Sequence, residues 1–188
     1  MKIWCLDYRD QIYTDATMRN VTRYRGMKFF RGIRYAEQFP SDGTVEVKSK
    51  RPPTDFFHAG IFWVISSKIR DILEFYNVEA EYFRLRVVDK KGNSFVGEWW
   101  CFNPTLVLNW FDRSQSRFVL EQDFATHIES IVINSAVLND VPLSVAEKTI
   151  PVLVCARDDI AKSIVSNKCS GVVFRDPQDW QNPANPVT

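Results

Sequence analysis

The two histidines are the first residues to examine for catalysis, because an imidazole can bind a metal or carry a proton near neutral pH. His127 and Glu129 match the His-x-Glu part of the zinc deaminase signature, in which the histidine binds zinc and the glutamate transfers protons. That signature also needs a Pro-Cys-x-x-Cys pair, and the four cysteines are scattered along the chain without one. His58, between Phe57 and Ala59 in a predicted loop, is typical of a packing histidine. We therefore expect no metal site and no cofactor.

Other motifs of common enzymes are also missing from the sequence. It contains no Gly-x-Ser-x-Gly elbow, no Walker loop and no Gly-x-Gly-x-x-Gly turn, and 7 glycines leave little material for a phosphate-binding loop. Asp158 and Asp159 form a carboxylate pair, but they precede a predicted helix, where acidic side chains stabilise the helix dipole. We expect a protein that is not an enzyme. The remaining enzymatic hypothesis is an unfamiliar type that uses Asp or Glu residues in a cleft.

A basic and aromatic segment is the strongest candidate for binding. From Arg19 to Arg34 the chain has six basic residues and no acidic residue. The basic residues are Arg19, Arg23, Arg25, Lys28, Arg31 and Arg34, and the aromatic residues are Tyr24, Phe29, Phe30 and Tyr35. Three interpretations stay open: a solvated face with its rings in the core, a patch that grips the carboxylates of a protein partner, or a surface that stacks on single-stranded nucleic acid.

The distribution of charge favours a protein partner over nucleic acid. The formal net charge is only +1, but residues 1–54 carry 11 basic and 6 acidic side chains, whereas residues 55–188 carry 13 basic and 17 acidic ones. Such asymmetry is typical of a basic surface that meets an acidic partner. A dedicated nucleic-acid-binding domain has a pI above about 9, and this chain has a pI of about 7.6. A nucleic-acid-binding regulatory domain is therefore the alternative function.

Strands and short helices must position these residues. Residues 62–85 and 152–174 each have the pattern of a buried strand, a helix with one apolar face and a second strand. Alternation over residues 83–100, interrupted by a polar turn with a glycine, predicts a hairpin. The predicted fold class is α+β, with a mixed, mainly antiparallel sheet, two strand–helix–strand units and an irregular N-terminal segment.

The organisation along the chain is predicted in three parts. Residues 1–55 are a basic N-terminal segment packed on the main domain, residues 56–176 form that domain, and residues 177–188 are a flexible tail with three prolines. The first apolar run ends at Asp7, which is too short for a secretory signal, and no apolar stretch is long enough to cross a bilayer. We expect a cytoplasmic protein that does not enter membranes.

Four stretches between Phe62 and Trp180 carry a family resemblance. They are Trp63–Leu73, Trp100–Asn103, Leu108–Ser116 and Val152–Phe174. Together they resemble the bacterial immunity-protein family that is numbered eleven among those of polymorphic toxin systems and was first catalogued as a domain of unknown function. The resemblance covers roughly two-thirds of the chain. It implies a protein that binds and neutralises a cognate toxin made by the same cell, and it brings no catalytic residues with it.

The resemblance and the charge pattern together name candidate contact residues. An immunity protein needs a rigid scaffold and a surface whose charge is complementary to its toxin, and arginines and aromatic residues dominate the affinity of such interfaces. The candidates for contact with a toxin are Arg23, Arg25, Lys28, Arg31, Trp110 and Asp112. For Trp110 and Asp112 the competing interpretation is a core ring followed by a turn-forming aspartate.

Overall fold

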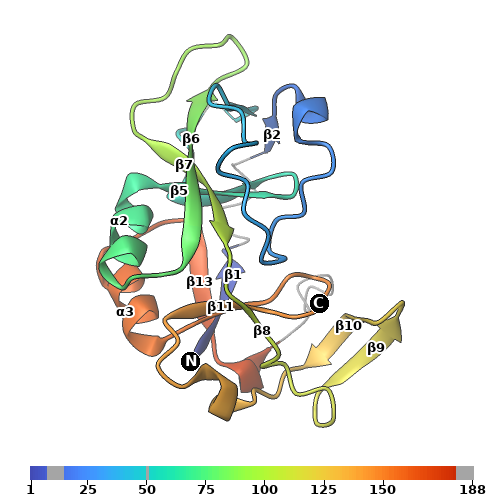
Figure 1. The fold of residues 1–188 in the computed structure, drawn as a ribbon. Coiled ribbons are helices and arrows are strands. Elements are labelled where there is room, and N and C mark those ends of the chain that lie inside the picture. Colours follow the sequence, from blue (N-terminus) through green and yellow to red (C-terminus); the bar gives the residue numbers. More distant parts are fainter. Residues whose placement is uncertain (8–14, 50, 181–188) are drawn as a thin grey trace.

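The computed structural model describes residues 1–7, 15–49 and 51–180, and its largest sheet closes into a barrel (Figure 1). The barrel strands, in spatial order, are β2 (Ala16–Met18), β3 (Thr44–Val47), β6 (Ala80–Val88), β7 (Trp99–Pro104), β5 (Phe62–Ser66) and β4 (Phe56–Ala59). They are rich in valine and aromatic residues, which favour extended backbone. A parallel bridge between Ala16 and Ala59 joins β2 to β4 and closes the ring.

A second sheet of five strands lies below the barrel in Figure 1. Its order is β13 (Val172–Arg175), β1 (Lys2–Leu6), β12 (Val154–Ala156), β11 (Leu143–Ala146) and β8 (Val107–Leu108). Successive side chains of a strand point to opposite faces. Trp4 therefore packs in one core, whereas Ile3 and its cross-strand partner Cys155 pack in another.

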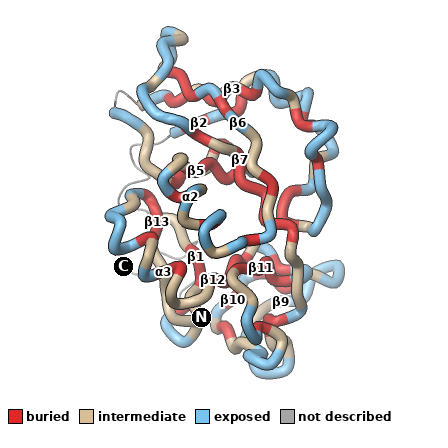
Figure 2. Tube along the Cα trace, turned by 60° about the vertical axis from the view of Figure 1, so that its left-hand side comes forward, coloured by how far each residue is buried: buried red, intermediate tan, exposed pale blue. Residues whose placement is uncertain are grey.

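The remaining strands form a two-stranded ribbon, β9 (Arg117–Glu121) and β10 (Phe124–Ser130), at the lower right of Figure 1. The ribbon covers the second face of the five-stranded sheet, because Ala125 and Ile128 of β10 pack with Ile3 and Cys155. In Figure 2, buried stretches accordingly run through the barrel strands and again around β11. The fold thus has two cores, with the five-stranded sheet between them.

The two strand–helix–strand units have one topology. Helix α2 (Ser67–Phe75) connects β5 to β6, and α3 (Asp158–Ser166) connects β12 to β13. In each unit the two strands lie on either side of an antiparallel strand, β7 in the first and β1 in the second. The helices lie beside each other on the left of Figure 1. In the described part of the chain, no helix is both long and apolar enough to cross a membrane.

The predicted α+β class is confirmed, with mixed sheets and both predicted units. The closed barrel was not predicted. It forms because residues 1–55 are part of the sheets: β1 joins the five-stranded sheet, and β2 and β3 complete the barrel. The described part of the N-terminal segment therefore contains three strands and is not irregular, and the sequence indicates two of them as short apolar runs, at Ile3–Leu6 and at Thr44–Val47. These strands are short, so local periodicity gives only a weak signal for them.

The start of the predicted tail belongs to the folded domain. Pro177–Asp179 form a 3-10 turn, and Trp180, 7% exposed, packs in the second core. The Trp180 indole N–H donates to the carbonyl of Ile128 at 2.9 Å. The ordered structure therefore extends beyond residue 176, and residues 181–188 lie outside the described part of the chain.

The burial of His58 makes the stability of the fold sensitive to acid. It lies in β4 rather than in a loop, and its ring stacks on Trp63 with a centroid distance of 5.4 Å. Burial lowers the pKa of His58 from 6.5 to about 4. The unfolded chain therefore binds more protons than the folded chain between these two pH values, and the stability falls as the pH drops through this window.

We expect the lowered pKa of His58 to reduce the free energy of unfolding by about 2 kcal/mol when the pH falls from about 7.5 to about 5. Urea unfolding at both pH values measures the loss, and His58→Gln should remove that part of it. An equal loss of stability in the wild type and in the variant would show that His58 is not the responsible group.

Candidate functional site

The basic segment folds with its rings inward and most of its cations outward. Tyr24, Phe29, Phe30 and Tyr35 are all at most 6% exposed and belong to the first core. Phe29 packs edge-to-face on Phe62 of β5 at 5.2 Å, and Phe30 lies 4.7 Å from Trp63. Buried rings cannot stack on nucleotide bases, so the main structural argument for single-stranded nucleic acid is lost.

A buried polar pair fixes this segment to the barrel. Glu81 of β6 and Asn103 of β7 lie opposite each other, and the Asn103 amide donates to the Glu81 carboxylate at 2.9 Å. The same carboxylate accepts the backbone N–H groups of Tyr35 and Ala36 at 2.8 Å. The Asn103 side chain accepts the N–H of Phe30 at 3.2 Å. Because both side chains are buried, these bonds have few competitors from water, and they determine where the basic loop lies.

The basic segment has no acidic residue of its own, but in the fold it lies beside acidic residues from other segments. Three of its arginines pair with carboxylates from outside the run, at N–O distances of 2.7–2.8 Å. The pairs are Arg19 with Glu46, Arg23 with Asp42, and Arg34 with Glu79. All six side chains are more than a quarter exposed, so each pair adds little stability. The positive surface is therefore weaker than the sequence indicates.

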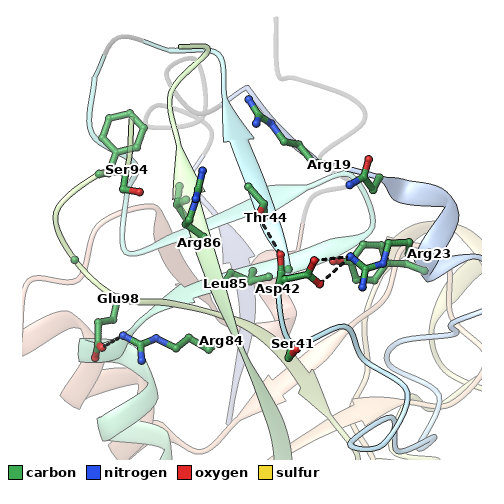
Figure 3. Close-up of a pocket in the computed structure, with 16 residues that line it drawn as sticks. Arg19, Arg23, Ser41, Asp42, Thr44, Arg84, Leu85, Arg86, Ser94 and Glu98 are labelled. Carbon is green, nitrogen blue, oxygen red and sulfur yellow. Dashed lines mark hydrogen bonds and ion pairs between the residues drawn. The ribbon is translucent and has the colours of Figure 1, made fainter. Parts of the chain in front are cut away.

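A groove opens at the end of the barrel beside this segment, with a volume of about 620 Å³. One wall is the stretch from Arg19 to Tyr24 together with Ser41–Thr44, and the other is Arg84–Val87 of β6 with the loop that leads to β7. The lining contains four arginines and two carboxylates: Arg19, Arg23, Arg84, Arg86, Asp42 and Glu98 (Figure 3). We name this feature the basic groove.

Arg86 is the available cation of the basic groove. Arg23 pairs with Asp42, and Arg84 pairs with Glu98 at 2.5 Å. Hydrogen bonding to Arg23 is the main cause that lowers the pKa of Asp42, so this carboxylate stays charged at neutral pH. Arg86 is exposed and forms no ion pair with a described residue, and Figure 3 shows its guanidinium apart from both pairs. A single guanidinium in a polar groove can bind a carboxylate in forked geometry.

The structure brings only one of the predicted contact residues into the basic groove, which is Arg23. Arg25 and Lys28 are exposed and make no ion pair within the described ranges. Arg31 lies over the ring of Phe124 at 4.9 Å, and burial lowers the pKa of its guanidinium. Arg31 thus connects the basic segment to the ribbon, while Arg25 and Lys28 stay candidates for contact.

For Trp110 and Asp112 the structure supports the competing interpretation, which is a core ring followed by a turn-forming aspartate. Trp110 is 0% exposed in the second core, so it cannot be a surface anchor in this structure. Asp112 closes a turn: its carboxylate accepts the N–H and the hydroxyl of Ser114 and the amide of Gln115. These hydrogen bonds, led by the Ser114 hydroxyl, lower the pKa of Asp112.

Sequence reasoning missed Arg84 and Arg86. Both are polar positions in the alternating pattern of residues 83–100, and in β6 they point away from the barrel interior, where Leu85 and Val87 are buried. Alternation predicts that they are exposed, but only the pairing of β3 with β6 brings them beside the basic segment. The sequence holds no local signal for that pairing.

Comparison with known proteins gives one family. A family model described as immunity protein family (Imm11) matches residues 5–179 of the 188. The match includes strands from the barrel, the five-stranded sheet and the ribbon. A comparison with curated proteins found no match.

Proposed function

The chain belongs to the Imm11 immunity protein family, and we propose that it binds a cognate bacterial toxin in the cytoplasm and neutralises it without catalysis of its own. The family match over residues 5–179 is the observation that carries the proposal. The basic segment supports it, because its aromatic residues are used in the core and its exposed cations face outward on a rigid scaffold. Such a surface can select an acidic partner without any catalytic group.

We place the toxin contact at the basic groove and the adjacent loop with Arg25 and Lys28. The groove is concave, has four arginines against two carboxylates, and leaves Arg86 without an ion pair to any residue that the structure describes. Its walls are fixed, since the N–H of Arg86 donates to the carbonyl of Gly43 at 2.8 Å across the groove. A preorganised wall loses little conformational entropy when a partner binds.

The function is tested by expressing the chain together with a candidate toxin, chosen as any toxin-like protein that is encoded by a neighbouring gene. We expect restored growth and co-purification of the two proteins. If the chain neither restores growth nor purifies with that protein, the proposed function is wrong.

The location of the contact is tested separately by Arg86→Glu, with Lys162→Glu on the distant helix α3 as the matched charge reversal. We expect Arg86→Glu to reduce the association rate with the toxin at least about tenfold at low salt, because it reverses the attraction for an acidic surface. Lys162→Glu should change the rate less than about twofold. Stopped-flow or surface-based kinetics at two salt concentrations provide the measurement. Equal rates for both variants would place the toxin elsewhere on an otherwise functional immunity protein.

A further inference from the structure

Strand β9 has an open edge that carries apolar side chains. Among the described residues it pairs with β10 alone, on one side, and Figure 1 shows it on the outer side of the ribbon. Val119 is 48% exposed and Leu120 is 60% exposed. An open edge with exposed apolar residues is a template for another strand, and folded proteins usually protect such edges.

The hairpin geometry determines which backbone groups face the open side. Gln122 and Asp123 both have positive φ, as expected for the two-residue turn that joins Glu121 to Phe124. In such a hairpin the closing pair exchanges backbone hydrogen bonds, and bonded and non-bonded pairs then alternate as far as Thr126 and Val119. Beyond that pair the register of β10 shifts by extra residues before Ser130, whereas β9 continues as a regular strand whose backbone groups alternate in direction. The N–H and C=O groups of Phe118 and Leu120 therefore point away from β10. Outside the β9–β10 ladder these groups have no partner among the described residues.

The sequence of β9 is complementary to itself in the antiparallel direction. The strand reads Arg-Phe-Val-Leu-Glu, with Val119 at its centre. If two copies pair about Val119, each Arg117 lies opposite the Glu121 of the other copy, and each Phe118 lies opposite a Leu120. Opposite charges and apolar pairs across strands both stabilise a sheet. This register also places the free backbone groups of Phe118 and Leu120 opposite each other, where they form hydrogen-bonded pairs.

We propose that two copies of this chain associate symmetrically through β9, so that their ribbons form one four-stranded antiparallel sheet. Charge complementarity of the strand with itself favours a second copy over an unrelated strand. The symmetry is that of a closed two-fold dimer, which leaves no further edge of β9 for growth into a fibre. Two five-residue strands cover less surface than the roughly 1,200 Å² of a stable interface. The dimer is therefore reversible, with a Kd in the range of about 1–100 µM.

Sedimentation velocity from about 1 µM to about 500 µM tests the association. We expect the wild type to pass from monomer to dimer over this range. Arg117→Glu and Glu121→Arg each place like charges opposite each other twice, and each should raise the Kd at least about tenfold. Thermal melts of both variants control for folding, and both side chains are exposed.

Mixing the two variants makes the test specific for the register. One variant carries only acidic and the other only basic residues at positions 117 and 121, so an equimolar mixture should form a heterodimer although neither variant pairs with itself. The combined charge swap in one chain should restore the dimer. A monomeric wild type up to about 500 µM, or charge variants that dimerise like the wild type, would overturn the proposal.

The toxin is the other possible occupant of this edge, and one further measurement separates it. Arg117→Glu should leave toxin binding unchanged within about twofold, because Arg117 belongs neither to the lining of the basic groove nor to the loop with Arg25 and Lys28. A monomeric wild type whose toxin binding is weakened by Arg117→Glu would assign the edge to the toxin and refute pairing of two copies.

Discussion

Glu81→Leu is expected to lower the free energy of unfolding by about 3–5 kcal/mol. The substitution removes the acceptor of two backbone N–H groups and of the Asn103 amide, all of which are held at 2.8–2.9 Å in the barrel wall. Each buried donor that is left without a partner costs about 1–3 kcal/mol. The loop from Phe30 to Ala36 should therefore loosen and expose rings that now fill the core.

Two measurements distinguish this effect from a general loss of packing. Urea unfolding gives the free energy, and limited trypsin digestion should cut faster after Arg31 and Arg34, which lie in the loosened loop. Glu79→Gln is the matched control, because Glu79 is 52% exposed, forms its ion pair with the exposed Arg34 and otherwise accepts a long hydrogen bond of 3.4 Å from the Thr105 hydroxyl. It should change the stability by less than about 0.5 kcal/mol. If Glu81→Leu is as stable as the control, the buried pair does not hold the loop.

Trp110→Ala is expected to lower the free energy of unfolding by about 3–5 kcal/mol, because Trp110 is among the largest fully buried side chains of the chain. This outcome differs from that of a surface anchor, whose truncation would weaken toxin binding and leave stability intact. Denaturant unfolding and toxin affinity, measured on the same preparation, separate the two roles.

Trp110→Phe provides the control for size and polarity. The indole N–H of Trp110 is buried and has no hydrogen-bond partner among the described residues, so phenylalanine loses volume but no bond. We expect a loss of about 1–2 kcal/mol, clearly less than for alanine. A stable Trp110→Ala variant with weakened toxin binding would show that Trp110 contacts the toxin and is not a core residue.

The fold was predictable where local periodicity and turn chemistry coincide. Both strand–helix–strand units follow from the apolar spacing of residues 62–85 and 152–174, and the hairpin between β6 and β7 follows from alternation and a turn. The barrel was not predictable in this way. Its closure depends on the pairing of β2 with β4 and of β3 with β6, between segments that are distant in sequence. Strand pairing of this kind leaves no periodic signal in either segment.

The candidate site was likewise predictable only in part. Composition and order alone determined that residues 19–34 are basic, that the chain lacks common catalytic motifs and that it resembles an immunity family. Only the tertiary structure decided that the rings of this segment face the core, that three of its arginines meet carboxylates, and that Arg86 from β6 joins it. The physical reason is that the residue types and their spacing along the chain determine which chemical groups are present. Coulomb attraction and burial, however, act through space, between strands whose pairing the sequence does not reveal.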